Sequence, residues 1–179
     1  MRSLCSLALF GALSVSLYGS TLRQLSLDDM IRQSTTIVRG KAQQTSTSLH
    51  GSIIFTHYRI QVTETLKGPL TSQIDIGVPG GVTGGVDQRY AGAPSLSSTQ
   101  DYVLFLWTSK SGLTQVIGLS QGLFAILTNA VRQPVIVRAA ATERMVDAAG
   151  QPVTDSDIQM LLSDLRSRIQ LVLSGKGGK

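Results

Sequence analysis

The sequence predicts a mainly β fold: an OB-like β-barrel of about five to seven strands, with a short N-terminal helix and a longer C-terminal amphipathic helix. Three patterns predict this class. Residues 53–66 alternate between apolar and polar side chains, residues 101–108 are nearly all apolar, and apolar side chains recur at helical spacing over residues 158–172. The first pattern is typical of a strand with one buried face, the second of a strand buried on both faces, and the third of an amphipathic helix.

Capping patterns mark the start of both predicted helices. Ser26 precedes Asp29 at the spacing of a capping box, and the first helix is expected to end near residues 33–35. Thr154 and Asp157 repeat this spacing before the C-terminal helix. The apolar stripe expected on that helix consists of Ile158, Leu161, Leu162, Leu165, Ile169 and Val172. A helix packed on the barrel is the first interpretation of the stripe, and a partner-binding helix is the alternative.

A hairpin and several shorter strands are predicted between the helices. Residues 36–47 and 53–66 are separated by a His-Gly turn and should pair as antiparallel strands. The buried face of the second strand is expected to carry Ile54, Tyr58, Ile60, Val62 and Leu66. Further strands are predicted near residues 74–78, 101–108, 113–119, 122–128 and 135–138. Residues 79–98 show neither a strand pattern nor a helix pattern.

The first 20 residues are typical of an export signal. Arg2 provides a positive start, residues 4–17 form an uncharged apolar run, and small residues follow. Such a run is short for a membrane span, so we expect a cleaved signal peptide over residues 1–20, with an uncleaved anchor as the alternative. Small residues at 14–16 and at 19–20 leave the cleavage point open. The protein is therefore predicted to be exported, to the periplasm or outside the cell.

Composition predicts one globular domain, residues 21–175, followed by a flexible tail, residues 176–179. The apolar content of 42% suffices for a core, and the 15% of charged residues argues against disorder. Cys5 is the sole cysteine and lies at the start of the apolar run instead of just after it, which excludes a lipoprotein and leaves the mature domain free of disulfides. Loss of Arg2 with the signal would lower the net charge from +5 to +4. The remaining basic residues are scattered, so no nucleic-acid partner is expected, and neither is a stable membrane span after cleavage.

Four segments together resemble a known group of proteins. In order they read STTIVRGKA, YRIQVTETLKG, DYVLFLW and GLSQGLFAI, within residues 25–128. This layout is similar to that of uncharacterised bacterial exported proteins that resemble the netrin-module and tissue-inhibitor-of-metalloproteinase group, which has an OB-like barrel. The resemblance implies the barrel alone. The inhibitors of that group present an N-terminal Cys to a protease zinc, and a mature chain without Cys cannot build that device.

A possible nucleophile lies in residues 118–122, which match the pattern Gly-x-Ser-x-Gly around Ser120. A nucleophile elbow requires a strand, a sharp turn and then a helix. Residues 123–127 have the pattern of a strand instead, and both histidines, His50 and His57, precede the serine. We therefore interpret the segment as a turn between two strands and predict no catalytic residue.

Metal and cofactor sites are not predicted either. His50 and His57 have no neighbouring cysteine or carboxylate cluster, whereas zinc requires three or four ligands. Asp155 and Asp157 lack the rest of a calcium loop, and helix capping accounts for both carboxylates. The glycine-rich residues 79–85 are not followed by the Lys-Ser or Lys-Thr and helix of a phosphate-binding loop.

The long patternless segment is the predicted contact surface. Loops of more than about 15 residues in a compact domain are usually functional or disordered. Within residues 79–98, Val82, Arg89 and Tyr90 offer apolar, cationic and aromatic contacts. The sequence thus predicts an exported, non-catalytic binding domain for a protein or peptide, including an exported peptidase. The alternatives are a secreted serine hydrolase that uses Ser120 and a structural component of the cell envelope.

Overall fold

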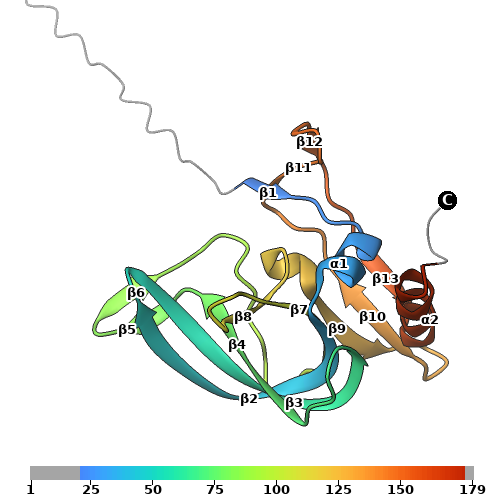
Figure 1. The fold of residues 1–179 in the computed structure, drawn as a ribbon, viewed down its shortest axis with the longest axis horizontal. Helices are drawn as coiled ribbons and strands as arrows, with labels where there is room; N and C mark the ends of the chain where they lie inside the picture. The colour runs from blue at the N-terminus through green and yellow to red at the C-terminus, as the bar shows by residue number, and fades with distance from the viewer. Residues whose placement is uncertain (1–20, 176–179) are drawn as a thin grey trace, which may run out of the picture.

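The computed structural model describes residues 21–175, and the predicted signal peptide, residues 1–20, and tail, residues 176–179, lie outside them (Figure 1). The strands are β1 (Thr21–Arg23), β2 (Thr36–His50), β3 (Ile53–Lys67), β4 (Gln73–Pro79), β5 (Gly81–Thr83), β6 (Val86–Gln88), β7 (Tyr102–Thr108), β8 (Thr114–Val116), β9 (Leu123–Thr128), β10 (Pro134–Arg138), β11 (Arg144–Val146), β12 (Pro152–Val153) and β13 (Ile158–Leu161). The helices are α1 (Leu27–Gln33), the 3-10 helix η1 (Leu119–Gly122) and α2 (Leu162–Leu173). The mainly β class with a helix near each end is therefore confirmed. Of the helices in this part of the chain, none has the length and apolar character needed to cross a membrane.

The longest strands, β2 and β3, form the predicted antiparallel hairpin. Four of the five side chains predicted on its inner face are buried: Ile54, Tyr58, Ile60 and Val62. Leu66 is the exception, because the β2–β3 register passes from Thr65 directly to Lys67 and leaves Leu66 as a bulge. Leu66 consequently packs beside the helices, in a different core from Tyr58, Ile60 and Val62.

The main sheet has the strand order β13-β10-β9-β7-β2-β3-β4, and β8 pairs with β7 away from this path. It curls until β4 lies against β8 (Figure 1). No ladder joins these two strands among the described residues, so the sheet is not closed into the predicted barrel. Side chains fill the seam instead: a Cβ at Gly77 would lie 2.8 Å from Cδ1 of Leu113.

Strand β7 separates two hydrophobic cores and is buried on both faces, as its sequence predicts. One face contributes Tyr102, Leu104 and Leu106 to a first core inside the curl of β2, β3, β4, β7 and β8. The other face contributes Val103 and Phe105 to a second core, which includes residues of α1, α2, β9 and β10. Alternation along one strand thus joins the curled sheet to the helical layer.

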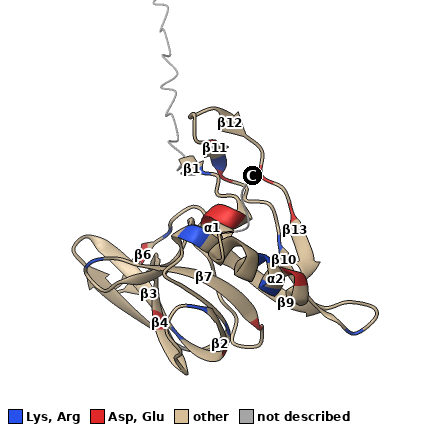
Figure 2. Cartoon of the chain, turned by 45° about the vertical axis from the view of Figure 1, so that its right-hand side comes forward, with Lys and Arg blue, Asp and Glu red and all other residues tan. Residues whose placement is uncertain are grey.

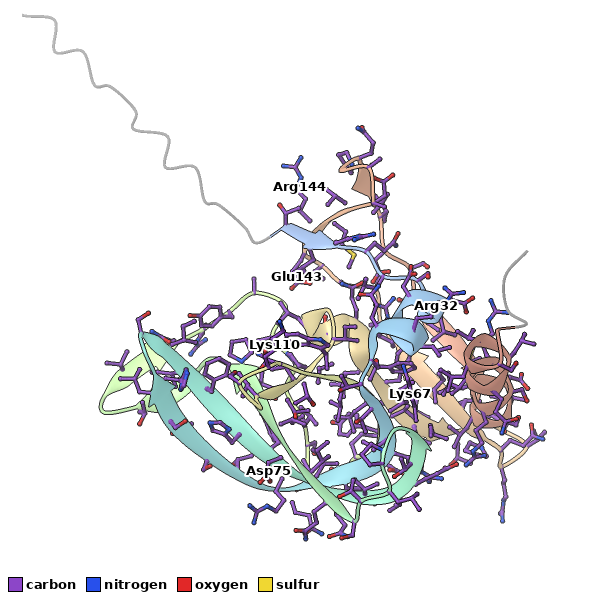
Figure 3. The ribbon with its side chains drawn as sticks, viewed as in Figure 1. Arg32, Lys67, Asp75, Lys110, Glu143 and Arg144 are labelled. Atoms are coloured by element: carbon purple, nitrogen blue, oxygen red, sulfur yellow. The ribbon has the colours of Figure 1, made fainter. Side chains whose placement is uncertain are left out.

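The N-terminal helix begins and ends with side-chain caps. Ser26 Oγ accepts a hydrogen bond from the N–H of Asp29 at 3.1 Å, which confirms the predicted cap. At the other end, Lys67 Nζ donates to the carbonyls of Ile31, Arg32 and Ser34 at 2.7, 3.0 and 2.6 Å. Figure 3 shows Lys67 close to α1, where its ammonium group meets the negative end of the helix dipole.

Replacing Lys67 with Met should therefore lower the free energy of unfolding by about 2 kcal/mol, because three helix-terminal carbonyls lose a charged donor. Urea denaturation followed by circular dichroism measures this loss. Lys41→Met is the matched control, since Lys41 is exposed on β2 and makes no hydrogen bond or ion pair in residues 21–175. Equal losses in both variants would contradict the capping role of Lys67.

The C-terminal helix is shorter than predicted, because residues 158–161 form β13 and pair with β10. Leu161 is the N-cap of α2 and provides no side-chain hydrogen bond. The predicted capping role of Asp155 and Asp157 is wrong: Asp155 pairs with Arg138, and Asp157 accepts a hydrogen bond from the N–H of Ala140. The first four residues of the stripe, of which three are apolar, fit a strand as well as a helix. They form a strand because they pair with the free edge of β10.

Charged residues occur on many elements of the fold (Figure 2). Most arginines are paired with carboxylates, in the ion pairs of Arg32, Arg39, Arg59, Arg89, Arg138, Arg166 and Arg168. Most arginine charges are therefore offset locally by a carboxylate, in keeping with the scattered basic residues of the sequence.

Candidate functional site

The segment predicted to lack structure, residues 79–98, contains the β5–β6 hairpin, and this part of the prediction is wrong. Gly84 and Gly85 form its two-residue turn with φ of +56° and +77°. Positive φ at both central positions is what a tight hairpin requires, and glycine provides it without strain. The Gly-Gly pair between Val82-Thr83 and Val86 was the local signal that could have revealed this hairpin.

The hairpin is fastened to the tip of the β2–β3 ribbon. The N–H of Ile54 donates to Gln88 Oε1 at 2.7 Å, and Gln88 Nε2 donates to the carbonyl of Ser52 at 2.8 Å. Thr47 Oγ1 donates to the carbonyl of Val82 at 2.9 Å. These contacts use backbone groups and the polar side chains of Gln88 and Thr47, so they leave the apolar side chains of the hairpin outside the core.

All three predicted contact residues lie on or directly after this hairpin and are exposed. The exposed fraction is 60% for Val82 and 40% for Tyr90. Arg89 donates to Asp87 Oδ2 at 3.0 Å in a solvent-exposed pair. The structure adds Val86, which is 53% exposed. Sequence reasoning missed this residue because the segment was not recognised as a hairpin.

A groove lies where the same segment continues past the hairpin. Its volume is about 450 Å³. One wall is formed by residues 92–95 and the other by residues 139–143. Its remaining lining residues are Tyr102, Ser120, Leu123, Ala125, Val137 and Arg138. Both walls are irregular chain without strand pairing, and most lining side chains are small.

Ser120 lines this groove but is not placed in a catalytic triad. Its N–H donates to the carbonyl of Gly92 at 3.1 Å. Neither histidine lines the groove: His50 is the last residue of β2, and His57 lies on β3 in a separate hollow. The residues after Ser120 complete a 3-10 turn and enter β9, so the strand-turn-helix of a nucleophile elbow is not formed here.

The second hollow lies on the outer face of β2, β3 and β4 and has a volume of about 510 Å³. Its polar groups satisfy one another: Arg59 donates to both carboxylate oxygens of Asp75, at 2.8 and 3.1 Å, and Ser48 Oγ lies 2.7 Å from His57 Nε2. The hydrogen bond from Arg59 holds the pKa of Asp75 below its ordinary value, against the opposing effect of burial. Figure 3 shows Asp75 on the outside of the sheet.

Metal-ligating side chains are not clustered in the described part of the chain, where no group of three His, Cys, Asp or Glu residues could hold an ion. Comparison of the chain with protein-family models, with curated proteins and with solved structures finds no match.

Proposed function

We propose that this protein is an exported, non-catalytic binding domain that contacts a protein or peptide, such as an exported peptidase, through the β5–β6 hairpin. One observation carries the proposal: the hairpin exposes Val82, Val86 and Tyr90 while its attachment to the ribbon uses none of their side chains. Large exposed apolar side chains that contribute nothing to a core are typical of contact surfaces.

Two further features support this assignment. The N-terminal apolar run, with its positive start, supports export. The curl of β2, β3, β4, β7 and β8 around one core supports an OB-like barrel of the netrin-module and inhibitor group, in which β4 and β8 would be the strands at the seam. In such barrels, loops and short hairpins at the rim commonly hold the ligand-contacting residues.

A photo-cross-linking amino acid at position 82 or 90 should capture a defined partner in the compartment that holds the exported protein. Position 131 is the matched control, because Val131 is 72% exposed on the turn between β9 and β10. We expect adducts from positions 82 and 90 and none from 131. Equal capture from all three positions, or none from any, would overturn the proposed contact surface.

The hydrolase alternative has its own test. A fluorophosphonate probe labels an activated serine covalently. We expect no labelling of the intact protein, because Ser120 has no histidine in its groove. Labelling that Ser120→Ala abolishes would overturn the non-catalytic assignment. A structural envelope role would instead give neither labelling nor a cross-linked partner.

A further inference from the structure

Glu143 differs from every other carboxylate side chain of the protein in the contacts it makes. All other Asp and Glu side chains accept a hydrogen bond or form an ion pair within residues 21–175: Asp28, Asp29, Glu64, Asp75, Asp87, Asp101, Asp147, Asp155, Asp157 and Asp164. Glu143 has no such contact in that range, although it is only partly exposed. An acidic side chain that is half-buried without a donor is unusual, since folding removes water from it without replacing the lost hydrogen bonds.

The position of Glu143 directs this carboxylate to the groove. Glu143 lines the groove and lies against Gly92 of the opposite wall: a Cβ at Gly92 would be 3.1 Å from Cδ and 3.3 Å from Oε1 of Glu143. Arg144, the next residue, pairs with Thr21 in the β1–β11 ladder and projects away from the main body, whereas Glu143 lies on the side of the main body (Figure 3). The neighbouring arginine therefore does not neutralise Glu143.

The rest of the groove suits an extended chain. Its two walls, residues 92–95 and 139–143, are irregular segments outside the strand ladders. Some of their backbone groups are already bonded: the N–H groups of Ala93, Ala140 and Ala141 and the carbonyl of Gly92. Tyr102, Leu123 and Ala125 belong to or pack against the first core and give the groove an apolar base. The guanidinium of the one basic residue in the lining, Arg138, is held by Asp155. Glu143 is thus the unpaired charge of the groove, and it is negative.

We propose that the groove binds an extended peptide through an ammonium group, a Lys side chain or an amino terminus, that pairs with Glu143. The peptide backbone would lie along the two walls, and its small side chains would contact the apolar base. An ammonium group both donates hydrogen bonds and neutralises a carboxylate, which is what Glu143 lacks in the protein. This inference rests on the proposed function in one respect, that the partner is a protein or peptide.

Calorimetric titration with short blocked peptides tests the inference. The probes are acetyl-Ala-Ala-Lys-Ala-Ala-amide, the same peptide with Nε-acetyl-lysine, a penta-alanine amide with a free amino terminus, and n-butylammonium. We expect the lysine or the free-amine peptide to bind, which identifies the source of the ammonium group, and acetylation to weaken binding about tenfold. The inference would be overturned if the lysine peptide bound no better than its acetylated form and the free-amine peptide did not bind, or if n-butylammonium alone bound as tightly as the peptides.

Glu143→Gln should cause the same tenfold loss as acetylation of the peptide. Because Glu143 has no partner in the described part of the chain, this variant should keep the thermal transition of the parent protein. Asp164→Asn is the control of equal charge change, since Asp164 lies on α2 away from the groove lining. A matching loss in Asp164→Asn would reduce the effect to general electrostatics and overturn the pairing.

The two proposals can fail separately. If positions 82 and 90 capture a partner but none of the peptides binds, the groove inference is wrong and the proposed function stands. If a peptide binds in the groove and no adduct forms at the hairpin, the contact surface is wrong and the role of Glu143 stands.

Discussion

Replacing Arg138 with Met should lower the free energy of unfolding by about 4 kcal/mol. The Arg138 side chain is 6% exposed and donates through Nη2 to Oδ1 of Asp155, at 3.0 Å, whose side chain is 4% exposed. Methionine occupies a similar space without a charge, so Asp155 would keep a buried negative charge that only neutral donors contact, among them the N–H of Ala141 and, at 3.5 Å, the side-chain amide of Gln24. Urea denaturation measures the loss.

The geometry of this ion pair also indicates that replacing both partners should lower the free energy of unfolding by less than the sum of the two single losses. Nε and Nη1 of Arg138 are buried and find no acceptor within residues 21–175, although the guanidinium carbon lies 5.9 Å from the centre of the Phe124 ring. Asp155→Asn keeps an acceptor for the N–H of Ala141. We therefore expect the double variant Arg138→Met, Asp155→Asn to lose about 2 kcal/mol, and additive losses would contradict the coupling.

An exposed ion pair provides the control for this cycle. Arg59 and Asp75 are joined by two hydrogen bonds on the outer face of β3 and β4. Both side chains are about half exposed, so solvent screens the attraction between them. Arg59→Met should leave the denaturation midpoint nearly unchanged. Burial, rather than the number of hydrogen bonds, then accounts for the large effect at Arg138.

Acid should remove most of the difference in stability between the parent protein and Asp155→Asn. Burial by itself raises the pKa of Asp155, but the N–H of Ala141 and the charge of Arg138 outweigh it, and the pKa lies below its ordinary value. A lowered pKa in the folded state stabilises the protein above the unfolded value, about 4, and the gain is lost as pH falls through the folded pKa. The difference should be constant from pH 7 to about 5 and shrink below about 4. A difference independent of pH would contradict this assignment.

The strands that sequence reasoning located were those with a local signal. Alternation along β3 and the apolar run of β7 each depend on neighbouring residues alone, so both could be predicted with their burial. Residues 158–161 could not, because their apolar positions fit a helix stripe and a strand equally well, and pairing with β10 lies 20 residues or more away in the chain. Closure of the sheet was equally unpredictable, since it depends on how β4 meets β8.

One part of the candidate site could be predicted from a local sequence signal, and the other part could not. The hairpin that carries Val82 and precedes Tyr90 had a local marker, the glycine pair at its turn. The groove had none, because its walls come from residues 92–95 and 139–143, which only the fold brings together. Nothing in the sequence around Glu143 distinguishes it from other acidic residues, since the lack of a partner is a property of the surrounding structure.

The largest effect in the Gly-x-Ser-x-Gly segment should come from Gln121 and not from Ser120. Gln121 is 1% exposed; its Oε1 accepts from the N–H of Leu25 at 2.9 Å and its Nε2 donates to the carbonyl of Arg23 at 3.0 Å. Gln121→Ala should lower the free energy of unfolding by about 3 kcal/mol, because it leaves two backbone groups without partners and opens a cavity. Ser120→Ala should change it by less than about 0.5 kcal/mol.

The glycines of this segment serve the same structural purpose. Gly118 has a φ of +61°, and a Cβ there would lie 2.9 Å from Nε2 of Gln121; a Cβ at Gly122 would lie 2.8 Å from the carbonyl oxygen of Ile117. Gly118 thus leaves room for the amide of Gln121, which holds the chain between β1 and α1, and Gly122 allows the close approach of the Ile117 and Phe105 carbonyls. Hydrogen exchange at the Leu25 amide tests this directly: it should accelerate in Gln121→Ala and remain slow in Ser120→Ala. Equal protection in both variants would show that the segment is not organised around Gln121.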